Sequence, residues 1–168
     1  MEKRRLMVNT DLCTGCGFCA LVCAVHHCGQ WDPALGRIKP RSDKGRKLEA
    51  AITCAHCQEA PCVAACLMNV IYLDSDSQLV KRNLETCIGC RACEISCPFE
   101  AGTFDYILEK VVNCDLCDGS PTCVEYCPTG ALRFIDIYED MEQRRQKQLE
   151  QDLEFGLRLE GSFLKEGR

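Results

Sequence analysis

Cysteine is the side chain with the most chemistry to offer in this sequence, at about one residue in ten of 168. Thiolates act as nucleophiles, form disulfides or bind soft metals, and their spacing favours one of these uses over the others. All but one of the 17 cysteines fall into four short runs, and only Cys28 stands outside them. The runs are Cys13, Cys16, Cys19 and Cys23; Cys54, Cys57, Cys62 and Cys66; Cys87, Cys90, Cys93 and Cys97; and Cys114, Cys117, Cys123 and Cys127.

A disulfide scaffold and structural zinc are the two simpler explanations for so many cysteines. Disulfides need an oxidising compartment, and the odd number of cysteines also argues against complete pairing. The basic residues at 3–5 are followed by only three apolar residues, which is too short for a cleavable signal peptide. We therefore expect a cytoplasmic protein, with export bound to a signal-bearing partner as the alternative. Zinc ribbons use two C-x2-C knuckles separated by a longer loop, whereas each run here holds four cysteines close together.

The spacing within the runs favours iron–sulfur clusters. The third run and Pro98 match the pattern C-x2-C-x2-C-x3-C-P of bacterial ferredoxins, in which the fourth cysteine ligates the other cluster. Three cysteines in a tight loop can wrap three corners of a cubane, and we expect the fourth at a helix start, pointing to the neighbouring cubane. Gly15, Gly17 and Gly89 let the loop backbone approach the sulfides.

The sequence resembles the four-cluster iron–sulfur subunits of molybdenum and tungsten oxidoreductases over roughly residues 6–136. These include subunits of formate dehydrogenases, dimethyl sulfoxide reductase, formate-hydrogenlyase-type complexes and tungsten aldehyde oxidoreductases. The matching stretches are 13–27, 54–62, 87–93, 110–117 and 127–132. Ala24 and Leu67 replace the proline that often follows the last cysteine of a run, but that proline supplies no ligand.

The resemblance implies an α+β fold of two bacterial-type dicluster ferredoxin units, one inserted into the other, with short β-hairpins and a C-terminal helix. The expected parts are an outer ferredoxin unit (1–30 and 108–135), a hairpin insertion (31–52), an inner ferredoxin unit (53–107) and a helical tail (136–168).

The resemblance also implies four [4Fe-4S] clusters with crossed ligand sets. One set is Cys13, Cys16, Cys19 and Cys127; its neighbour is Cys114, Cys117, Cys123 and Cys23; the third is Cys54, Cys57, Cys62 and Cys97; the fourth is Cys87, Cys90, Cys93 and Cys66.

Two hairpins and a helix are expected from the sequence pattern. Two apolar runs around the polar turn 74–77 predict a hairpin over 70–81. A second hairpin is expected over 37–52, with its turn at 42–45. It carries six basic residues, which could form a docking face for an acidic partner. We favour the simpler interpretation, a solvated surface hairpin. In the tail, apolar residues at helical spacing predict an amphipathic helix that binds a partner, or otherwise covers its own domain. The six basic residues are Arg37, Lys39, Arg41, Lys44, Arg46 and Lys47, and the apolar residues of the tail are Ile137, Met141, Leu149, Leu153 and Leu157.

The remaining candidate ligands are expected to be bystanders. Each run already supplies four thiols, so His26, His27 and His56 should pack or donate hydrogen bonds. Cys28 is expected to be an inert thiol, with a spare ligand or a redox thiol as alternatives.

Charge and composition limit the function. A formal net charge of −5 argues against nucleic-acid binding, and no apolar run could span a bilayer. No general base, nucleophile or phosphate-binding loop emerges, so we expect no catalytic residues and a role in electron transfer. The resemblance implies a molybdenum- or tungsten-pterin catalytic subunit as partner, with a flavin, hydrogenase or further iron–sulfur subunit as additional candidates. A free polyferredoxin is the alternative, and a structural or DNA-processing iron–sulfur module is a third hypothesis.

Overall fold

The computed structural model describes residues 4–163, with the backbone alone for 153–163. The chain divides into two compact units, one of which is Arg5–Phe134 and contains every cysteine. The other combines the N-terminal end with Ile135 and the residues after it. The candidate functional residues therefore all belong to the unit of residues 5–134.

The strands of residues 4–163 form four two-stranded sheets. Strand β1 (Arg4–Val8) pairs with β8 (Leu132–Asp136), so the two ends of the cysteine-containing unit lie together. The other three sheets are antiparallel hairpins of consecutive strands. They are β2 (Lys39–Asp43) with β3 (Leu48–Ile52), β4 (Ile71–Leu73) with β5 (Val80–Arg82), and β6 (Thr103–Asp105) with β7 (Lys110–Val112).

Both hairpins expected from the sequence are present, with one shift. Strand β2 continues through Asp43, so the turn covers 44–47 and not 42–45. The Asp43 carboxylate ends the strand, because its Oδ1 accepts the backbone N–H of Gly45 at 3.0 Å and of Arg46 at 3.1 Å. Such a side-chain bond to the following backbone is typical of aspartate at the start of a turn.

The four runs of cysteines share one relation to the helices. Each run has its third cysteine as the second residue of a helix, and its fourth cysteine four residues later. The sequence-based expectation that the fourth cysteine starts the helix is therefore wrong. The helices are α1 (Phe18–Cys28), α2 (Pro61–Ala64), α3 (Ala92–Ile95) and α4 (Thr122–Glu125), and the short 3₁₀ turns are η1 (Pro33–Leu35) and η2 (Leu116–Gly119).

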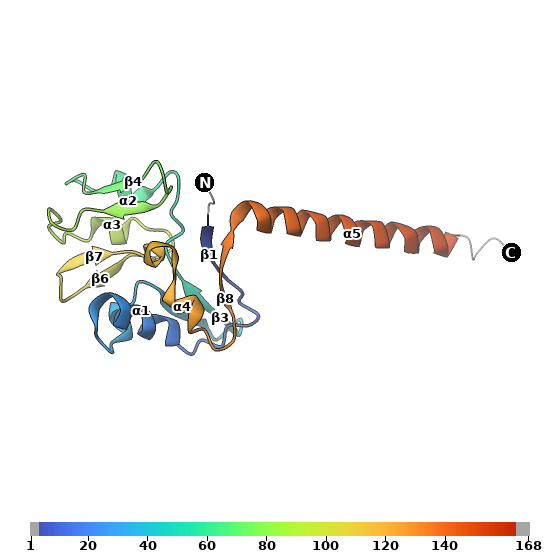
Figure 1. Ribbon diagram of the computed structural model, residues 1–168, viewed down its shortest axis with the longest axis horizontal. Coiled ribbons are helices and arrows are strands. Elements are labelled where there is room, and N and C mark those ends of the chain that lie inside the picture. Colours follow the sequence, from blue (N-terminus) through green and yellow to red (C-terminus); the bar gives the residue numbers. More distant parts are fainter. Residues whose placement is uncertain (1–3, 164–168) are drawn as a thin grey trace. The chain divides into compact units, whose positions relative to one another are not determined.

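The helices pack in two pairs. Helix α1 packs against α4, and α2 packs against α3. Figure 1 shows α2, α3 and β4 at one end of this unit, with α1, α4 and β3 at the other. Each end has its own apolar cluster, and cysteines are members of both: Cys23, Cys114 and Cys123 in one, Cys93 in the other. The first and fourth runs thus share one core, and the second and third runs share another.

The tail forms the single helix α5 (Ile137–Phe163), which confirms the expected helix. Asp136 caps its start, since Oδ1 accepts the backbone N–H of Tyr138 at 2.8 Å. The side chains of Tyr138, Met141 and Leu149 are exposed, whereas those of residues 153–163 lie outside the description. No helix within the described residues is both long and apolar enough to cross a bilayer.

Candidate metal centre

The loops that carry the first two cysteines of each run share one backbone conformation. The residue just before the second cysteine has a positive φ in all four loops: 67° at Gly15, 48° at His56, 68° at Gly89 and 61° at Leu116. This left-handed conformation is costly for residues with a Cβ and reverses the chain within a few residues. Glycine marks it in the first and third runs, but nothing in the sequence pattern marks His56 and Leu116.

One pocket brings together cysteines from the first and the last part of the sequence of the cysteine-containing unit. Its lining includes Cys13, Cys16 and Cys19 from the first run and Cys127 from the fourth. These are the members of one predicted ligand set. Burial, together with the neighbouring thiols and Cys127 among them, raises the pKa of Cys19 to about 11.

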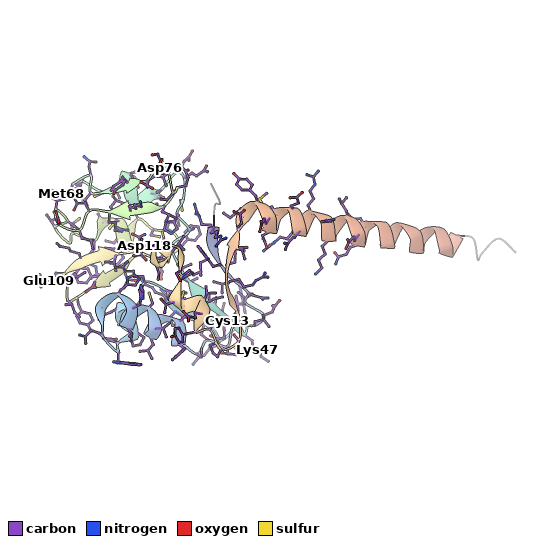
Figure 2. The ribbon with its side chains drawn as sticks, in the orientation of Figure 1. Cys13, Lys47, Met68, Asp76, Glu109 and Asp118 are labelled. Carbon is purple, nitrogen blue, oxygen red and sulfur yellow. The ribbon has the colours of Figure 1, made fainter. Side chains whose placement is uncertain are left out.

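A second pocket gathers another predicted set. Its lining includes Cys87, Cys90 and Cys93 from the third run and Cys66 from the second, together with Met68. Cys13 and Met68, which each line one of the two pockets, lie at opposite ends of the unit (Figure 2).

The eight other cysteines of the runs make up the two remaining predicted sets. Neighbouring thiols show how these sets follow one another through the unit. Burial, together with the nearby thiols of Cys114 and Cys117, raises the pKa of Cys23 to about 12. Burial also raises the pKa of Cys123, again with Cys114 as the strongest neighbour. These four thiols form the second predicted set.

The remaining predicted set lies beside the second one. Burial raises the pKa of Cys62, and Cys97 of the third run acts in the same direction. Burial, together with the nearby thiols of Cys114 and Cys62, raises the pKa of Cys54 to about 11. Cys57 follows in the same loop as Cys54. Cys54 is therefore a point where the third set approaches the second.

Every one of the 17 cysteines is described, and every one is a free thiol. Buried thiols with raised pKa values hold their protons, so a metal must displace them, which couples binding to proton release.

A buried histidine tests whether the loops fit an iron–sulfur cluster. The His56 ring is 3% exposed, and its Nδ1 accepts the backbone N–H of Val80 at 3.0 Å. Burial, followed by the charge of Arg5, lowers the pKa of His56 to about 4, so the ring is neutral and Nε2 carries its hydrogen. That buried Nε2 has no partner among the described residues. A donor of this kind in the loop of Cys54 and Cys57 fits a cluster whose sulfides accept hydrogen bonds.

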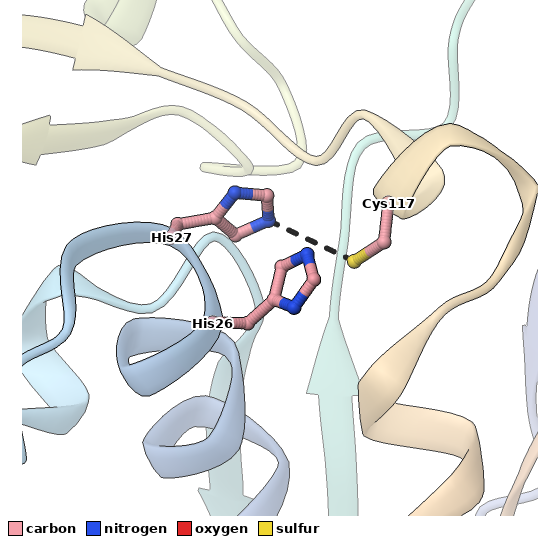
Figure 3. Close-up of side chains that lie close together, drawn as sticks. All are labelled: His26, His27 and Cys117. Carbon is pink, nitrogen blue, oxygen red and sulfur yellow. Dashed lines mark hydrogen bonds between the residues drawn. The ribbon is translucent and has the colours of Figure 1, made fainter.

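His27 is the second histidine that lies at a sulfur. Its Nε2 is 3.7 Å from Cys117 Sγ, and the His26 ring stands edge-on to it with the centroids 4.8 Å apart (Figure 3). Burial, helped by Arg37, lowers the pKa of His27, so the ring is neutral at pH 7. Two imidazoles and a thiol could hold a metal ion, but Cys117 belongs to the predicted set of Cys23. His27 is therefore better described as a hydrogen-bonding neighbour of that set.

The basic residues of the β2–β3 region are largely committed within the chain. Arg37 pairs with Asp115, Arg41 pairs with Glu100, and Lys39 donates to the backbone oxygen of Glu100 at 3.0 Å. These contacts fasten the hairpin to other segments of the unit. They leave little of the basic docking face that the sequence suggested as an alternative.

Cys28 stays apart from the four sets. Its thiol donates to Asp105 Oδ2 at 3.6 Å, and burial together with that carboxylate raises its pKa. The pKa shift favours the inert thiol expected from the sequence.

Two family models match the chain. A 4Fe-4S dicluster domain matches residues 48–137, and a 4Fe-4S binding domain matches residues 6–23. The chain is 40% identical over 131 residues to the putative oxidoreductase UacF of Escherichia coli, covering 74% of this chain and 20% of UacF. It thus spans about a fifth of the length of the first curated relatives that it matches.

Two shorter relatives match over most of their length. The polyferredoxin-like subunit of the aliphatic sulfonate oxidoreductase of Pyrococcus furiosus is 35% identical, over 75% of this chain and 72% of the relative. The putative electron transport protein YsaA of Escherichia coli is 31% identical, over 87% of this chain and 98% of the relative. Among solved structures, the BamBC complex of benzoyl coenzyme A reductase matches 88% of this chain and 90% of that chain, with 21% identity and a TM-score of 0.47, which is too weak to add to the fold.

The cysteine runs, the loops that carry them and these matches agree. The chain belongs to the 4Fe-4S dicluster domain family, and its cysteines bind [4Fe-4S] clusters. The expectation of iron–sulfur chemistry is confirmed. The number of clusters and the ligand of each iron remain predictions.

Proposed function

We propose that this protein is an electron-transfer subunit that holds four [4Fe-4S] clusters in the crossed ligand sets. The observation that carries the proposal is the gathering of Cys127 with Cys13, Cys16 and Cys19, and of Cys66 with Cys87, Cys90 and Cys93. Bound [4Fe-4S] clusters supply one-electron oxidation and reduction. The chain itself supplies sixteen thiols, four of which are buried, and a buried histidine donor at His56 that has no partner among the described residues.

The order of the ligand sets supports a relay role. The sets of Cys13 and Cys66 lie at opposite ends of the unit, and the other two approach each other at Cys54 and Cys114. Such an order joins two separate surfaces of the protein. A structural or DNA-processing module has no use for sites at both ends, so the third hypothesis is disfavoured.

A catalytic partner subunit is the second part of the proposal. Large apolar side chains beside the cysteines of the inner unit are exposed, as at Leu67, Ile88 and Ile95. Exposed apolar groups beside metal ligands favour coverage by another protein. We propose a molybdenum- or tungsten-pterin subunit as that partner, based on the resemblance, and the cytoplasm as the compartment, where thiols stay reduced. The alternative is a free polyferredoxin, although the Pyrococcus furiosus relative is named as a polyferredoxin-like subunit of an oxidoreductase.

Metal analysis of anaerobically purified protein tests the proposal. Four complete sets predict about sixteen irons per chain, with a visible charge-transfer absorption that bleaches on addition of dithionite. About eight irons would reduce the proposal to two clusters, and stoichiometric zinc would refute it. Co-purification with a large pterin-containing protein would distinguish the subunit from the free carrier.

A further inference from the structure

Two arginines lie near the cysteines of the third run, and of these Arg91 pairs with Glu94 whereas Arg82 bonds to a cysteine. Arg82 is the last residue of β5 and half-buried, and its guanidinium Nη1 donates to Cys93 Sγ at 3.1 Å. Its Nε donates to the side-chain oxygen of Asn113. Neither partner is a carboxylate, so these two bonds leave the positive charge of the guanidinium uncompensated.

Asn113 fixes this arginine in place. The Asn113 side chain is 7% exposed, and its Nδ2 donates to Val80 O at 3.1 Å and to Cys114 O at 2.9 Å. With its oxygen held by Arg82, the amide has partners on both sides. The guanidinium is thus held by a buried, satisfied network and not by a flexible side chain alone.

The field of Arg82 also reaches the neighbouring ligand set. At Cys62, burial raises the pKa of the thiol, and the Arg82 charge is the strongest influence that lowers it. Its charge acts in the same direction on Cys54. The guanidinium therefore lies near both sets of the inner unit, but it bonds directly only to the set of Cys93.

The hydrogen-bonding groups at two other cysteine sulfurs differ from Arg82 in charge. Cys23 Sγ accepts a backbone N–H from Arg37 at 3.3 Å, and the guanidinium of that arginine is paired with Asp115. Cys117 has His27 beside it, and this histidine is neutral at pH 7. Cys93 differs from Cys23 and Cys117 because its hydrogen bond comes from a charged guanidinium.

We propose that Arg82 raises the reduction potential of the cluster held by Cys66, Cys87, Cys90 and Cys93, so that an electron entering the protein rests there. This inference depends on the proposed function. Reduction adds one electron and hence one negative charge to the cluster. A cation hydrogen-bonded to its thiolate stabilises that reduced state relative to the oxidised one, and charge and hydrogen bonds at sulfur are established determinants of such potentials. The arginine stays protonated in both states, so it positions and polarises without exchanging a proton.

Three substitutions of Arg82 separate charge from hydrogen bonding. Arg82→Met removes both, Arg82→Gln keeps a neutral donor, and Arg82→Lys keeps the charge. Arg46→Met serves as the matched control, because Arg46 is an exposed cation of the β2–β3 turn that pairs with Asp43 and not with a cysteine. Each protein is titrated with dithionite anaerobically, and the reduced clusters are followed by electron paramagnetic resonance.

We expect Arg82→Met and Arg82→Gln to disfavour reduction of one cluster about tenfold, which is a fall of about 59 mV in one of the midpoints. Arg82→Lys should keep most of the wild-type value, and Arg46→Met should match wild type throughout. If Arg82→Met loses iron, the comparison of the midpoints of Arg82→Gln and Arg82→Lys still tests the proposal. Equal potentials in those two variants would overturn the proposal, as would midpoints that match wild type in Arg82→Met.

The wild-type protein separates this failure from failure of the proposed function. Fewer than four clusters in wild type would refute the four-cluster relay itself. Four clusters in wild type with unchanged potentials in the Arg82 variants would refute only the role of the arginine.

Discussion

The same backbone conformation recurs before the second cysteine of every run, although the residue there is Gly15, His56, Gly89 or Leu116. The structural reason for glycine at this position differs between the first and the third run. A Cβ on Gly89 would lie 2.2 Å from the backbone oxygen of Glu109, whereas a Cβ on Gly15 would meet only the flexible end of Glu49. The glycine of the third run is thus required by its neighbour as well as by its φ.

Gly89→Ala should therefore weaken the cluster of the third run. Alanine in the left-handed region costs about 1–2 kcal/mol, and the collision with the Glu109 carbonyl adds to that cost. The matched control is Gly29→Ala, because Gly29 has φ 65° but no atom within 4 Å of a new Cβ. Iron release to a chelator should be markedly faster in Gly89→Ala than in Gly29→Ala. Equal rates would show that the contact with Glu109 does not matter.

Cys127→Ala tests the crossed ligand sets. We expect the cluster in the loop of Cys13 to lose one iron and to give a three-iron signal in electron paramagnetic resonance after oxidation. Cys28→Ser is the control and should leave all clusters unchanged, because Cys28 bonds to Asp105 and not to a cysteine of the four sets.

Diffraction from iron-loaded wild-type protein decides the same question directly. Iron on Cys127 shared with Cys114 instead of Cys13 would refute the crossed scheme. Iron on Cys28 would refute its assignment as an inert thiol.

At the scale of elements, the spacing C-x3-C has a geometric explanation. Residues four apart on a helix lie on the same face, displaced by about 6 Å along the axis. Cys19 and Cys23 are related in this way on α1, so this helix can present two sulfurs side by side to two different clusters. In the other three runs the helix ends two residues before the fourth cysteine. Cys66, Cys97 and Cys127 therefore lie in the segments that follow α2, α3 and α4.

Helix α5 belongs to a separate unit, and it has exposed apolar side chains at Met141 and Leu149. Deletion of residues 138–168 should leave the iron content unchanged and abolish co-purification of the partner. Met141→Glu combined with Leu149→Glu should do the same without shortening the helix, whereas Gln143→Glu on another face should have no effect.

Loss of iron on deletion of the tail would contradict this prediction. The helix would then stabilise its own protein and would have no role in recruiting a partner.

At the scale of the whole molecule, cysteines take the place of core side chains. Cys23, Cys114 and Cys123 are each at most 8% exposed and belong to one apolar cluster, and Cys93 occupies the same role in the other. The two clusters hold only nine other buried residues, which are leucine, isoleucine and valine with one alanine. Metal binding must then contribute much of the folding free energy of residues 5–134.

Removal of iron should consequently unfold the cysteine-containing unit. We expect anaerobic chelation to abolish hydrogen-exchange protection in α1, α4 and the hairpins together, and reconstitution with iron and sulfide to restore it. Exchange within α5 is the internal control and should change little, because its described side chains are mostly exposed. Full protection without iron would show that the polypeptide folds by itself.

The sequence predicted the β4–β5 hairpin and missed the β6–β7 hairpin for a physical reason. The first has polar residues in its turn, as expected of a turn. The second has Tyr106, Ile107 and Leu108 exposed in its turn, where the buried Asp105 accepts the backbone N–H of Ile107 and of Leu108 at 2.9 Å each. An apolar turn held by one carboxylate resembles the middle of a strand in a sequence pattern.

The candidate site was more predictable than the fold, because its chemistry fixes the cysteine spacing. The residues outside the cysteine runs that contact the site were not predictable from the sequence. The bond from Arg82 to Cys93 and the orphaned donor of His56 depend on β5 lying beside both loops, and no periodicity reports that contact.

The gathering of Cys127 with the N-terminal loop also has a consequence for biosynthesis. Translation delivers Cys97, the last cysteine of the inner unit, well before Cys127, the last of the outer one. Among the cysteines of the four runs, those of the first run are therefore made first, and under the proposed crossed sets they are the last to find their fourth ligand. During that interval they would be open to oxidation or to the wrong metal, so we expect the first run to be the part of this unit most in need of protection by assembly factors.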